Sequence, residues 1–188
     1  MSDASFDRTS SETFHISPLI RITLLALFVS LTIPLPVLAT VTDSVISPKL
    51  LAFGIVLGGV ALFGILSERV ETSDRGIAVT YPIWVRWLRK GWSLPWSEVD
   101  ELSIRTTGQG GMVYYFVTQT RDRAYLLPMR IVRFRTLLQV VQQNTGIDTS
   151  TTRALAQPWM YLALLGCTLL LLAADAWTIL VGVQQIAG

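Results

Sequence analysis

The chain has 188 residues, of which 51% are hydrophobic and 15% are charged, with a formal net charge of +2. Ordinary soluble domains carry about 25% charged residues, so this composition argues against a wholly water-soluble protein. The single cysteine, Cys167, and the single histidine, His15, exclude an internal disulfide and argue against a Cys/His zinc site. We expect no metal and no cofactor.

A polar N-terminal tail, residues 1–17, precedes the first of three long apolar stretches. A helix needs about 20 apolar residues to cross a hydrocarbon core about 30 Å thick, so each stretch predicts a transmembrane helix. The stretches are residues 18–41 and 50–66, which form a predicted hairpin over 18–66, and residues 158–183, which leave a C-terminal tail at 184–188.

The first stretch has an alternative interpretation as a cleaved signal peptide. Val37 and Ala39 have the small-residue spacing that a signal peptidase recognises. Asp3, Asp7 and Glu12 argue against cleavage, because signal peptides begin with positive charge.

Two glycines in the second stretch, Gly54 and Gly58, lie about one helical turn apart. Small residues at this spacing let helix backbones approach closely in lipid. They predict helix packing, either against the first helix of the same hairpin or against a second copy of the chain.

The central segment, residues 67–157, holds most of the Lys and Arg residues. These residues collect on the cytoplasmic side of membrane proteins. We therefore predict that this segment and the N-terminus are cytoplasmic, in a protein of the plasma membrane or the thylakoid membrane.

Residues 81–92 are the densest local feature, because they combine three tryptophans with three cations. Indole rings prefer the headgroup level of a membrane, and Arg and Lys attract anionic lipids. One interpretation is a loop or hairpin that contacts the inner leaflet or a partner. The other is a pair of strands with Ile83, Val85 and Trp87 in the core. The candidate contact residues are Trp84, Arg86, Trp87, Arg89, Lys90 and Trp92.

The remaining pattern of the central segment predicts an α+β unit. Short apolar or alternating runs predict strands at 76–81, 93–95, 99–106, 112–120 and 124–127, with a turn at 108–111. After Pro128 the period changes, and a helix is predicted over residues 129–144, with Gly146 as its stop. Its apolar face consists of Ile131, Phe134, Leu138 and Val141.

This segment resembles the bacterial pleckstrin-homology-like domains found on small membrane proteins. The resemblance is carried by Leu94-Pro-Trp-Ser-Glu-Val99 with Leu102 and Ile104, by residues 113–118, by Tyr125-Leu-Leu-Pro128, and by Phe134, Leu137 and Leu138. It implies a β-sandwich or barrel closed by a C-terminal helix. The expected fold class is therefore a membrane protein with three transmembrane α-helices and one small PH-like domain. These are packing residues, so the resemblance implies a fold and no activity.

A second basic cluster consists of Arg121, Arg123, Arg130, Arg133 and Arg135. Arginine forks bind phosphate at two points, which makes these residues candidates for holding an anionic lipid headgroup. The alternative is a solvated basic face. We do not expect nucleic acid as a partner, because the predicted helices anchor the chain in a membrane.

No motif in the chain indicates catalysis. The nucleophile-elbow, P-loop, zinc-protease and dinucleotide-binding patterns do not occur, and the central segment has no histidine to act as a base. We predict a non-catalytic adaptor, or an assembly or stability factor for a membrane protein complex. Abundant Trp and Gln-rich helix ends are reminiscent of cyanobacterial membrane proteins, which favours a photosynthetic membrane.

The expected partners are the lipid bilayer and either another integral membrane protein or a second copy of the chain. One alternative function is an anionic-lipid sensor. Another is a small transporter or channel subunit that uses Asp175, a charge late in the third apolar stretch.

Overall fold

A computed structural model of the chain describes residues 11–41, 45–106, 108, 112–150, 152 and 158–187. The chain divides into two compact units. The sheet unit consists of Met1–Ser17 and Ser67–Ala156, and the helix unit consists of Pro18–Leu66 and Gln157–Gly188. The predictions for residues 1–10, for 109–111 and for residue 188 lie outside the described residues.

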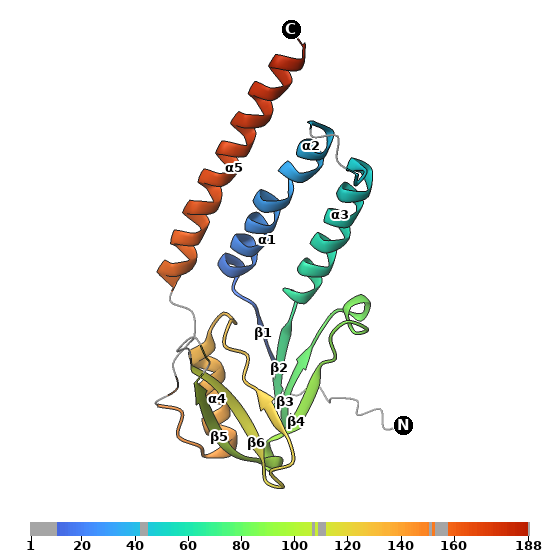
Figure 1. Cartoon of the computed structure of the whole chain (residues 1–188). Helices are drawn as coiled ribbons and strands as arrows, with labels where there is room; N and C mark the ends of the chain where they lie inside the picture. Colours follow the sequence, from blue (N-terminus) through green and yellow to red (C-terminus); the bar gives the residue numbers. More distant parts are fainter. Residues whose placement is uncertain are drawn as a thin grey trace. The chain divides into compact units, whose positions relative to one another are not determined.

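The helix unit contains three segments that are long and apolar enough to cross a membrane, as predicted: Pro18–Thr40, Pro48–Ile65 and Trp159–Val181. Its helices are α1 (Pro18–Thr32), α2 (Pro34–Val41), α3 (Pro48–Ile65) and α5 (Pro158–Ala187). Within this unit α1 lies between α3 and α5 and packs against both (Figure 1). The last helix continues to Ala187, past the end expected at residue 183.

The first apolar stretch is divided at Ile33 into α1 and α2, whereas the sequence suggested one helix over 18–41. Pro34 has no backbone N–H, so it cannot continue the helical hydrogen-bond ladder. It occupies the first position of α2, where a missing N–H is tolerated. Hydropathy measures only how apolar a stretch of residues is, so it does not reveal where the helix is interrupted.

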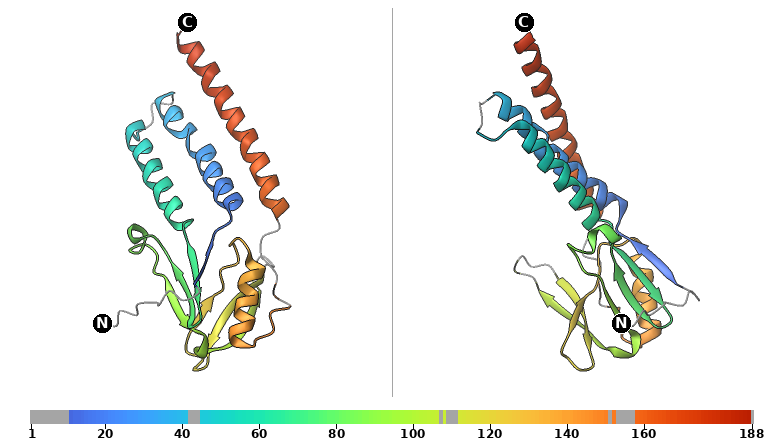
Figure 2. Two further views of the ribbon diagram at one scale, coloured as in Figure 1. Left: turned by 180° about the vertical axis from the view of Figure 1, so that it is seen from behind. Right: turned by 90° about the vertical axis from the view of Figure 1, so that its right-hand side faces the viewer.

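The sheet unit has two antiparallel sheets and one long helix (Figures 1 and 2). The first sheet has the order β1-β2-β3-β4 and the second the order β5-β6-β7. The elements are β1 (Glu12–His15), β2 (Arg69–Ser73), β3 (Gly76–Thr80), η1 (Ile83–Val85), β4 (Trp92–Pro95), η2 (Trp96–Glu98), β5 (Val99–Thr106), β6 (Met112–Thr118), β7 (Ala124–Leu126) and α4 (Phe134–Thr145).

The five predicted strands are confirmed to within two residues at their ends, and Gly108 lies in a turn. The helix expected over 129–144 begins five residues later, at Phe134. Ile131 instead forms a β-bridge with Ile16, which holds the preceding segment extended. Gly146 ends the helix as predicted, with φ 71° and its N–H donated to the Gln142 carbonyl at 2.9 Å.

The N-terminal strand β1 is the main difference from the sequence-based expectation, which treated residues 1–17 as a polar tail. Residues Glu12–His15 pair with β2, and Phe14 is buried in the core at 3% exposure. Phe14 alone is apolar in this strand, so no alternation marks it. Its partner β2 was not predicted either, and it follows only after the helical hairpin.

One core serves both sheets and α4. It includes Val70, Ile77, Phe116, Leu137 and Val141, each with no measurable exposure. The predicted apolar face of the helix segment, Ile131, Phe134, Leu138 and Val141, is buried. Trp96 is 6% exposed and donates its indole N–H to the Ser73 carbonyl at 2.8 Å, which confirms the structural role expected for it.

The register of the first sheet defines two ends. His15, Arg69 and Thr80 lie side by side at one end, where β1 leads into α1 and α3 leads into β2. We call this the junction end. The turn between Ser73 and Gly76 marks the opposite end, which we call the turn end.

Hydrogen bonds place the second sheet and the α4 segment relative to these ends. Trp96 N–H donates to the Arg75 carbonyl, and Gln119 N–H donates to the Glu98 carbonyl, both at 3.0 Å, so η2 and the β6–β7 turn lie at the turn end. Ser17 N–H donates to the Arg130 carbonyl at 3.0 Å, which places the segment before α4 at the junction end.

Candidate interaction surface

The segment between β3 and β4, residues 81–91, forms what we call the Trp loop. It leaves β3 after Thr80, the cross-strand neighbour of Arg69, so it begins at the junction end. Arg69 follows the last residue of α3, Ile65, by four residue steps, which span at most about 14 Å. The Trp loop therefore begins at the end of the first sheet at which the chain enters β2 after α3.

The loop is a compact turn stabilised by its own backbone. Pro82 and Val85 begin a 3₁₀ turn through a Val85 N–H bond to the Pro82 carbonyl at 2.9 Å. The Val85 carbonyl then accepts from Leu88 at 2.8 Å and from Arg89 at 2.9 Å. Val85 itself is 2% exposed and is part of the core. With the bond from the Arg86 N–H to the Ile83 carbonyl at 3.3 Å, four backbone hydrogen bonds and one buried side chain stabilise the loop.

Four apolar side chains project from this turn into solvent: Ile83 (82% exposed), Trp84 (45%), Trp87 (83%) and Leu88 (46%). The interpretation of residues 81–92 as a strand pair with Ile83, Val85 and Trp87 in the core is wrong for Ile83 and Trp87. The reason is the backbone, because residues 83–85 form a 3₁₀ turn and residues 86–88 continue as a turn, so side chains do not alternate as they would in a strand. The cations Arg86, Arg89 and Lys90 are also exposed.

Tyr81 ties the loop to the α3–β2 connection. Its hydroxyl donates to Glu68 Oε2 at 2.8 Å and accepts from Arg89 Nη1 at 3.4 Å. Arg86 Nε donates to the Tyr81 carbonyl at 3.4 Å. Burial, with the Glu68 carboxylate beside the ring, raises the pKa of Tyr81 to about 12. The hydroxyl therefore remains protonated at neutral pH and keeps its hydrogen bond to Glu68.

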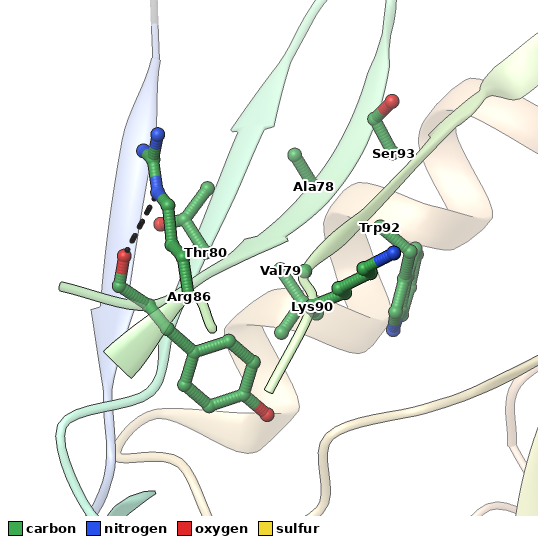
Figure 3. Close-up of a pocket in the computed structure, with 9 residues that line it drawn as sticks. Ala78, Val79, Thr80, Arg86, Lys90, Trp92 and Ser93 are labelled. Carbon is green, nitrogen blue, oxygen red and sulfur yellow. Dashed lines mark hydrogen bonds between the residues drawn. The ribbon is translucent and has the colours of Figure 1, made fainter. Parts of the chain in front are cut away.

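A groove of about 450 Å³ runs between β3, β4 and the Trp loop (Figure 3). Figure 3 draws Arg86, Lys90 and Trp92 among the side chains that line it. Its floor is close-packed, since a Cβ added at Gly91 would lie 2.1 Å from the Val79 carbonyl oxygen. The groove is therefore an apolar surface with two cations at its rim.

Trp92 differs from the other predicted contact residues. It is only half-buried, and its ring centroid lies 5.1 Å from that of Tyr125 and 6.4 Å from that of Phe116. These contacts join β4 to the second sheet. Trp92 therefore packs against the core, while Trp84 and Trp87 remain the exposed indoles of the loop.

The five arginines of the second basic cluster separate into two groups. Arg121 and Arg123 belong to the β6–β7 turn at the turn end, where Arg121 pairs with Asp100 at 3.5 Å and Arg123 with Asp122 at 3.7 Å. Hydrogen bonds from Thr120 and Thr118 to the Asp122 carboxylate lower the pKa of that group. The cations of the β6–β7 turn thus have carboxylate partners.

Arg130, Arg133 and Arg135 form the other group, which we call the arginine triad. All three are exposed, and neither salt bridge within the described part of the chain includes one of them. The Arg133 guanidinium carbon lies 6.0 Å from the centroid of the Phe14 ring in β1. The sequence shows five arginines within 15 residues but not that they belong to opposite ends of the unit.

Arg133 does not stabilise the helix that it precedes. It occupies the N-cap position of α4 with φ 60° and ψ 36° and makes no side-chain cap. A left-handed backbone is disfavoured by roughly 1–2 kcal/mol in a residue with a Cβ, and a Ser or Asp cap would add about 1 kcal/mol. Cations at a helix N-terminus are unfavourable by about 0.3–1 kcal/mol each.

In the helix unit, Gly58 contacts α1 whereas Gly54 does not. A Cβ on Gly58 would lie 3.2 Å from Phe28 Cζ, and one on Gly59 would lie 3.4 Å from the same ring. Nothing lies within 4 Å of a Cβ on Gly54. Nearby, the Arg21 guanidinium lies 4.1 Å from the centre of the Phe63 ring, so a cation–π contact also joins α1 to α3.

Asp175 lies on α5, within the third candidate membrane span. From Asp175 to the end of the candidate span at Val181 is about 9 Å along the helix axis. Its Oδ2 is buried and has no hydrogen-bond partner among the described residues. The described residues also contain no group of three His, Cys, Asp or Glu side chains placed to hold a metal ion.

A comparison with curated proteins finds one from Synechocystis sp. with the name "Uncharacterized protein slr0269". The two are 52% identical over 162 residues, which cover 85% of this chain and 81% of that protein. An alignment of this length includes residues of both units. No protein-family model matches the chain. No solved structure matches it either.

Proposed function

This chain belongs to the same family as the Synechocystis protein, and from that premise we propose that it is a non-catalytic, membrane-anchored adaptor. Its three apolar helices cross a membrane, its sheet unit lies on the cytoplasmic face, and its Trp loop binds another integral membrane protein. The observation that carries the proposal is the exposure of Ile83, Trp84, Trp87 and Leu88 on a rigid turn at the junction end.

The proposed topology is supported by how the hairpin joins the sheet. The chain enters α1 after β1 and returns from α3 into β2, and these strands pair as His15↔Arg69. Both ends of the hairpin are thus on one side of the membrane, and α5 then takes the C-terminus to the other. The excess of Lys and Arg in the sheet unit supports the cytoplasmic side.

Retention of the first helix is supported by the same strand. Phe14 precedes α1 and lies in the core, so signal cleavage after Ala39 would remove a core residue and an edge strand from the sheet unit. The proposed PH-like fold is supported by two sheets of four and three antiparallel strands followed by one amphipathic helix. The plasma membrane or the thylakoid membrane is the proposed location.

The composition of the Trp loop supports a protein partner. Soluble surfaces rarely expose several large apolar side chains together, and such patches mark binding sites. Trp and Arg are the side chains that most often dominate binding energy at protein interfaces. The loop combines Trp84 and Trp87 with Arg86 and Arg89, which fits a partner that presents an apolar surface bordered by acidic groups near the membrane.

Affinity purification from gently solubilised membranes tests the adaptor. We expect the tagged chain to retain a membrane protein in stoichiometric amount, and we expect Trp84→Ala/Trp87→Ala to lose it. Trp177→Ala, which removes an indole that is 71% exposed on α5, is the matched control and retains the partner. Recovery of the wild-type chain alone would contradict the proposal.

The anchoring is tested separately. The protein should stay in the membrane fraction after alkaline carbonate extraction, and protease added outside sealed cells should leave the sheet unit intact. Release by carbonate, or external cleavage between Arg69 and Ser150, would exclude the proposed topology.

A further inference from the structure

We propose that the arginine triad, Arg130, Arg133 and Arg135, is a binding site for the phosphate headgroups of anionic lipids. This inference rests on the proposed function, because it requires the helix unit to lie in a membrane and the junction end to face it. It adds a ligand of a different class from the partner of the Trp loop.

The triad and the Trp loop are separate surfaces of the junction end. The segment before α4 pairs with β1, through the Ile16↔Ile131 bridge, at one edge of the first sheet. The Trp loop connects β3 to β4, at the other edge. With strands about 4.8 Å apart, at least roughly 10 Å separates the two elements, so each can bind its own ligand.

Backbone hydrogen bonds within the sheet unit hold the segment of Arg130 beside Ser17, the last residue before α1 in the chain. Ser17 N–H donates to the Arg130 carbonyl at 3.0 Å, and Val132 N–H donates to the His15 carbonyl at 2.8 Å. Ser17 directly precedes Pro18, the first residue of the first candidate span. The headgroup layer of a bilayer extends about 5–8 Å beyond each side of the hydrocarbon core. The triad therefore lies within reach of lipid phosphates.

The charges of the triad have no counterpart within the described part of the protein. Both salt bridges found among the described residues are at the turn end, on Arg121 and Arg123. The exposed triad includes no such pair, and its members lie within four residues of Phe134, the first residue of α4, where cations are unfavourable. An anion bound there would compensate the guanidinium groups.

Arg133 has an unfavourable backbone conformation. Its φ of 60° is in the left-handed region, and its side chain leaves the helix uncapped while the guanidinium carbon lies 6.0 Å from the Phe14 ring. Arg121 at the turn end has a similar backbone, with φ 55°, so this strain does not by itself distinguish the triad. A membrane phosphate, which arginine binds at two points, is the ligand that fits the charge, the exposure and the location.

The test uses the full-length chain, purified in a neutral detergent and mixed with equal amounts of phosphatidylglycerol and phosphatidylcholine. Native mass spectrometry measures which lipid is retained. The wild type is compared with Arg130→Gln/Arg133→Gln and with Arg121→Gln/Arg123→Gln, which removes the same charge from the turn end. Arg130→Lys/Arg133→Lys keeps the charge, and a further sample contains millimolar inorganic phosphate.

We expect the wild type to retain phosphatidylglycerol in preference to phosphatidylcholine. Each arginine near a membrane surface strengthens anionic-lipid binding about fivefold, so Arg130→Gln/Arg133→Gln weakens it roughly 25-fold. The turn-end variant changes it less than about twofold, because those cations already have partners. The lysine variant, which retains the charge but not the two-point fork, binds more tightly than the glutamine variant and more weakly than the wild type.

Equal losses in the two glutamine variants, or no loss in either, would overturn the proposal. Displacement of the lipid by millimolar phosphate would assign the triad to soluble anions and would overturn the lipid assignment. The readout needs no partner protein. A chain that prefers phosphatidylglycerol but captures no partner through the Trp loop therefore refutes the adaptor and leaves the lipid site standing.

Discussion

The two ends of the sheet unit differ in whether their charged side chains form salt bridges with other residues. At the turn end, Arg121 pairs with Asp100, and Asp122 accepts hydrogen bonds from Thr118 and Thr120. At the junction end, the exposed arginine triad has no salt bridge among the described residues, and four large apolar side chains project from the Trp loop.

The largest expected effect concerns how the junction end is built. Phe14→Ala removes a ring that is 3% exposed in the core, and such a change lowers the free energy of unfolding by about 3–5 kcal/mol. Thr13→Ala, on the exposed side of the same strand, should change it by less than about 0.5 kcal/mol. Denaturant unfolding of the full chain in detergent, followed by Trp fluorescence, measures both. Equal midpoints would show that β1 is not part of the core.

The second prediction concerns the hydrogen bond from Tyr81 to Glu68, which ties the Trp loop to the α3–β2 connection. It is tested by measuring stability at alkaline pH. The pKa of Tyr81 is about 12 in the folded chain, against 10.0 ordinarily. The folded state therefore holds this proton more tightly, and stability falls as the pH rises from about 10 to 12. After allowance for solvent screening, the loss amounts to roughly 2 kcal/mol at most.

Tyr81→Phe isolates that contribution, because it removes only the hydroxyl group of Tyr81. The difference in unfolding midpoint between the wild type and Tyr81→Phe should narrow as the pH rises from 10 to 12. A difference that stays constant over this range would show that the hydroxyl does not donate to Glu68.

The smallest expected effect on stability is at the turn end. Here stability is lost as the pH falls, whereas the contribution of Tyr81 is lost as the pH rises. Hydrogen bonds from Thr120 and Thr118 lower the pKa of Asp122, so its contribution is present above the ordinary carboxyl pKa and is lost as the pH falls through the lowered value. Asp122→Asn should remove this acid-side dependence and leave the alkaline one unchanged. The measurement is the unfolding midpoint from neutral to acid pH, and an unaltered profile would contradict the assignment.

A comparison inside the helix unit sharpens the packing argument. Gly58→Ala brings a Cβ within 3.2 Å of the Phe28 ring, whereas Gly54→Ala meets nothing within 4 Å. The Phe28 ring can shift, so Gly58→Ala should cost about 1 kcal/mol or less and Gly54→Ala nothing in the monomer. Thermal unfolding in detergent distinguishes them. A larger effect at Gly54 would indicate contact with a second copy.

The sequence was sufficient where the pattern is local. An alternating run located β3, an apolar and aromatic run located β6, and the period change located α4, with Gly146 as its end. Composition identified the Trp loop as a contact candidate. Which of its side chains are exposed could not be predicted, because a turn that buries Val85 and exposes Ile83 and Trp87 has no signature in composition.

The features that the sequence did not reveal depend on pairing between segments that lie far apart in the chain. The strand β1 has one apolar residue, Phe14, and its partner follows only after the helical hairpin. The five arginines look like one cluster in the sequence, but β7 runs between Arg123 and Arg130 and carries them to opposite ends. No local rule contains that information.

Photocrosslinking in intact membranes tests the central claim most directly. A photoreactive residue replaces Trp87 at the junction end in one protein, and it replaces Ser97, exposed in η2 at the turn end, in another. We predict a discrete adduct with one membrane protein from position 87 and none from position 97. Adducts of equal yield from both positions, or an absence of any protein adduct from position 87, would contradict the account.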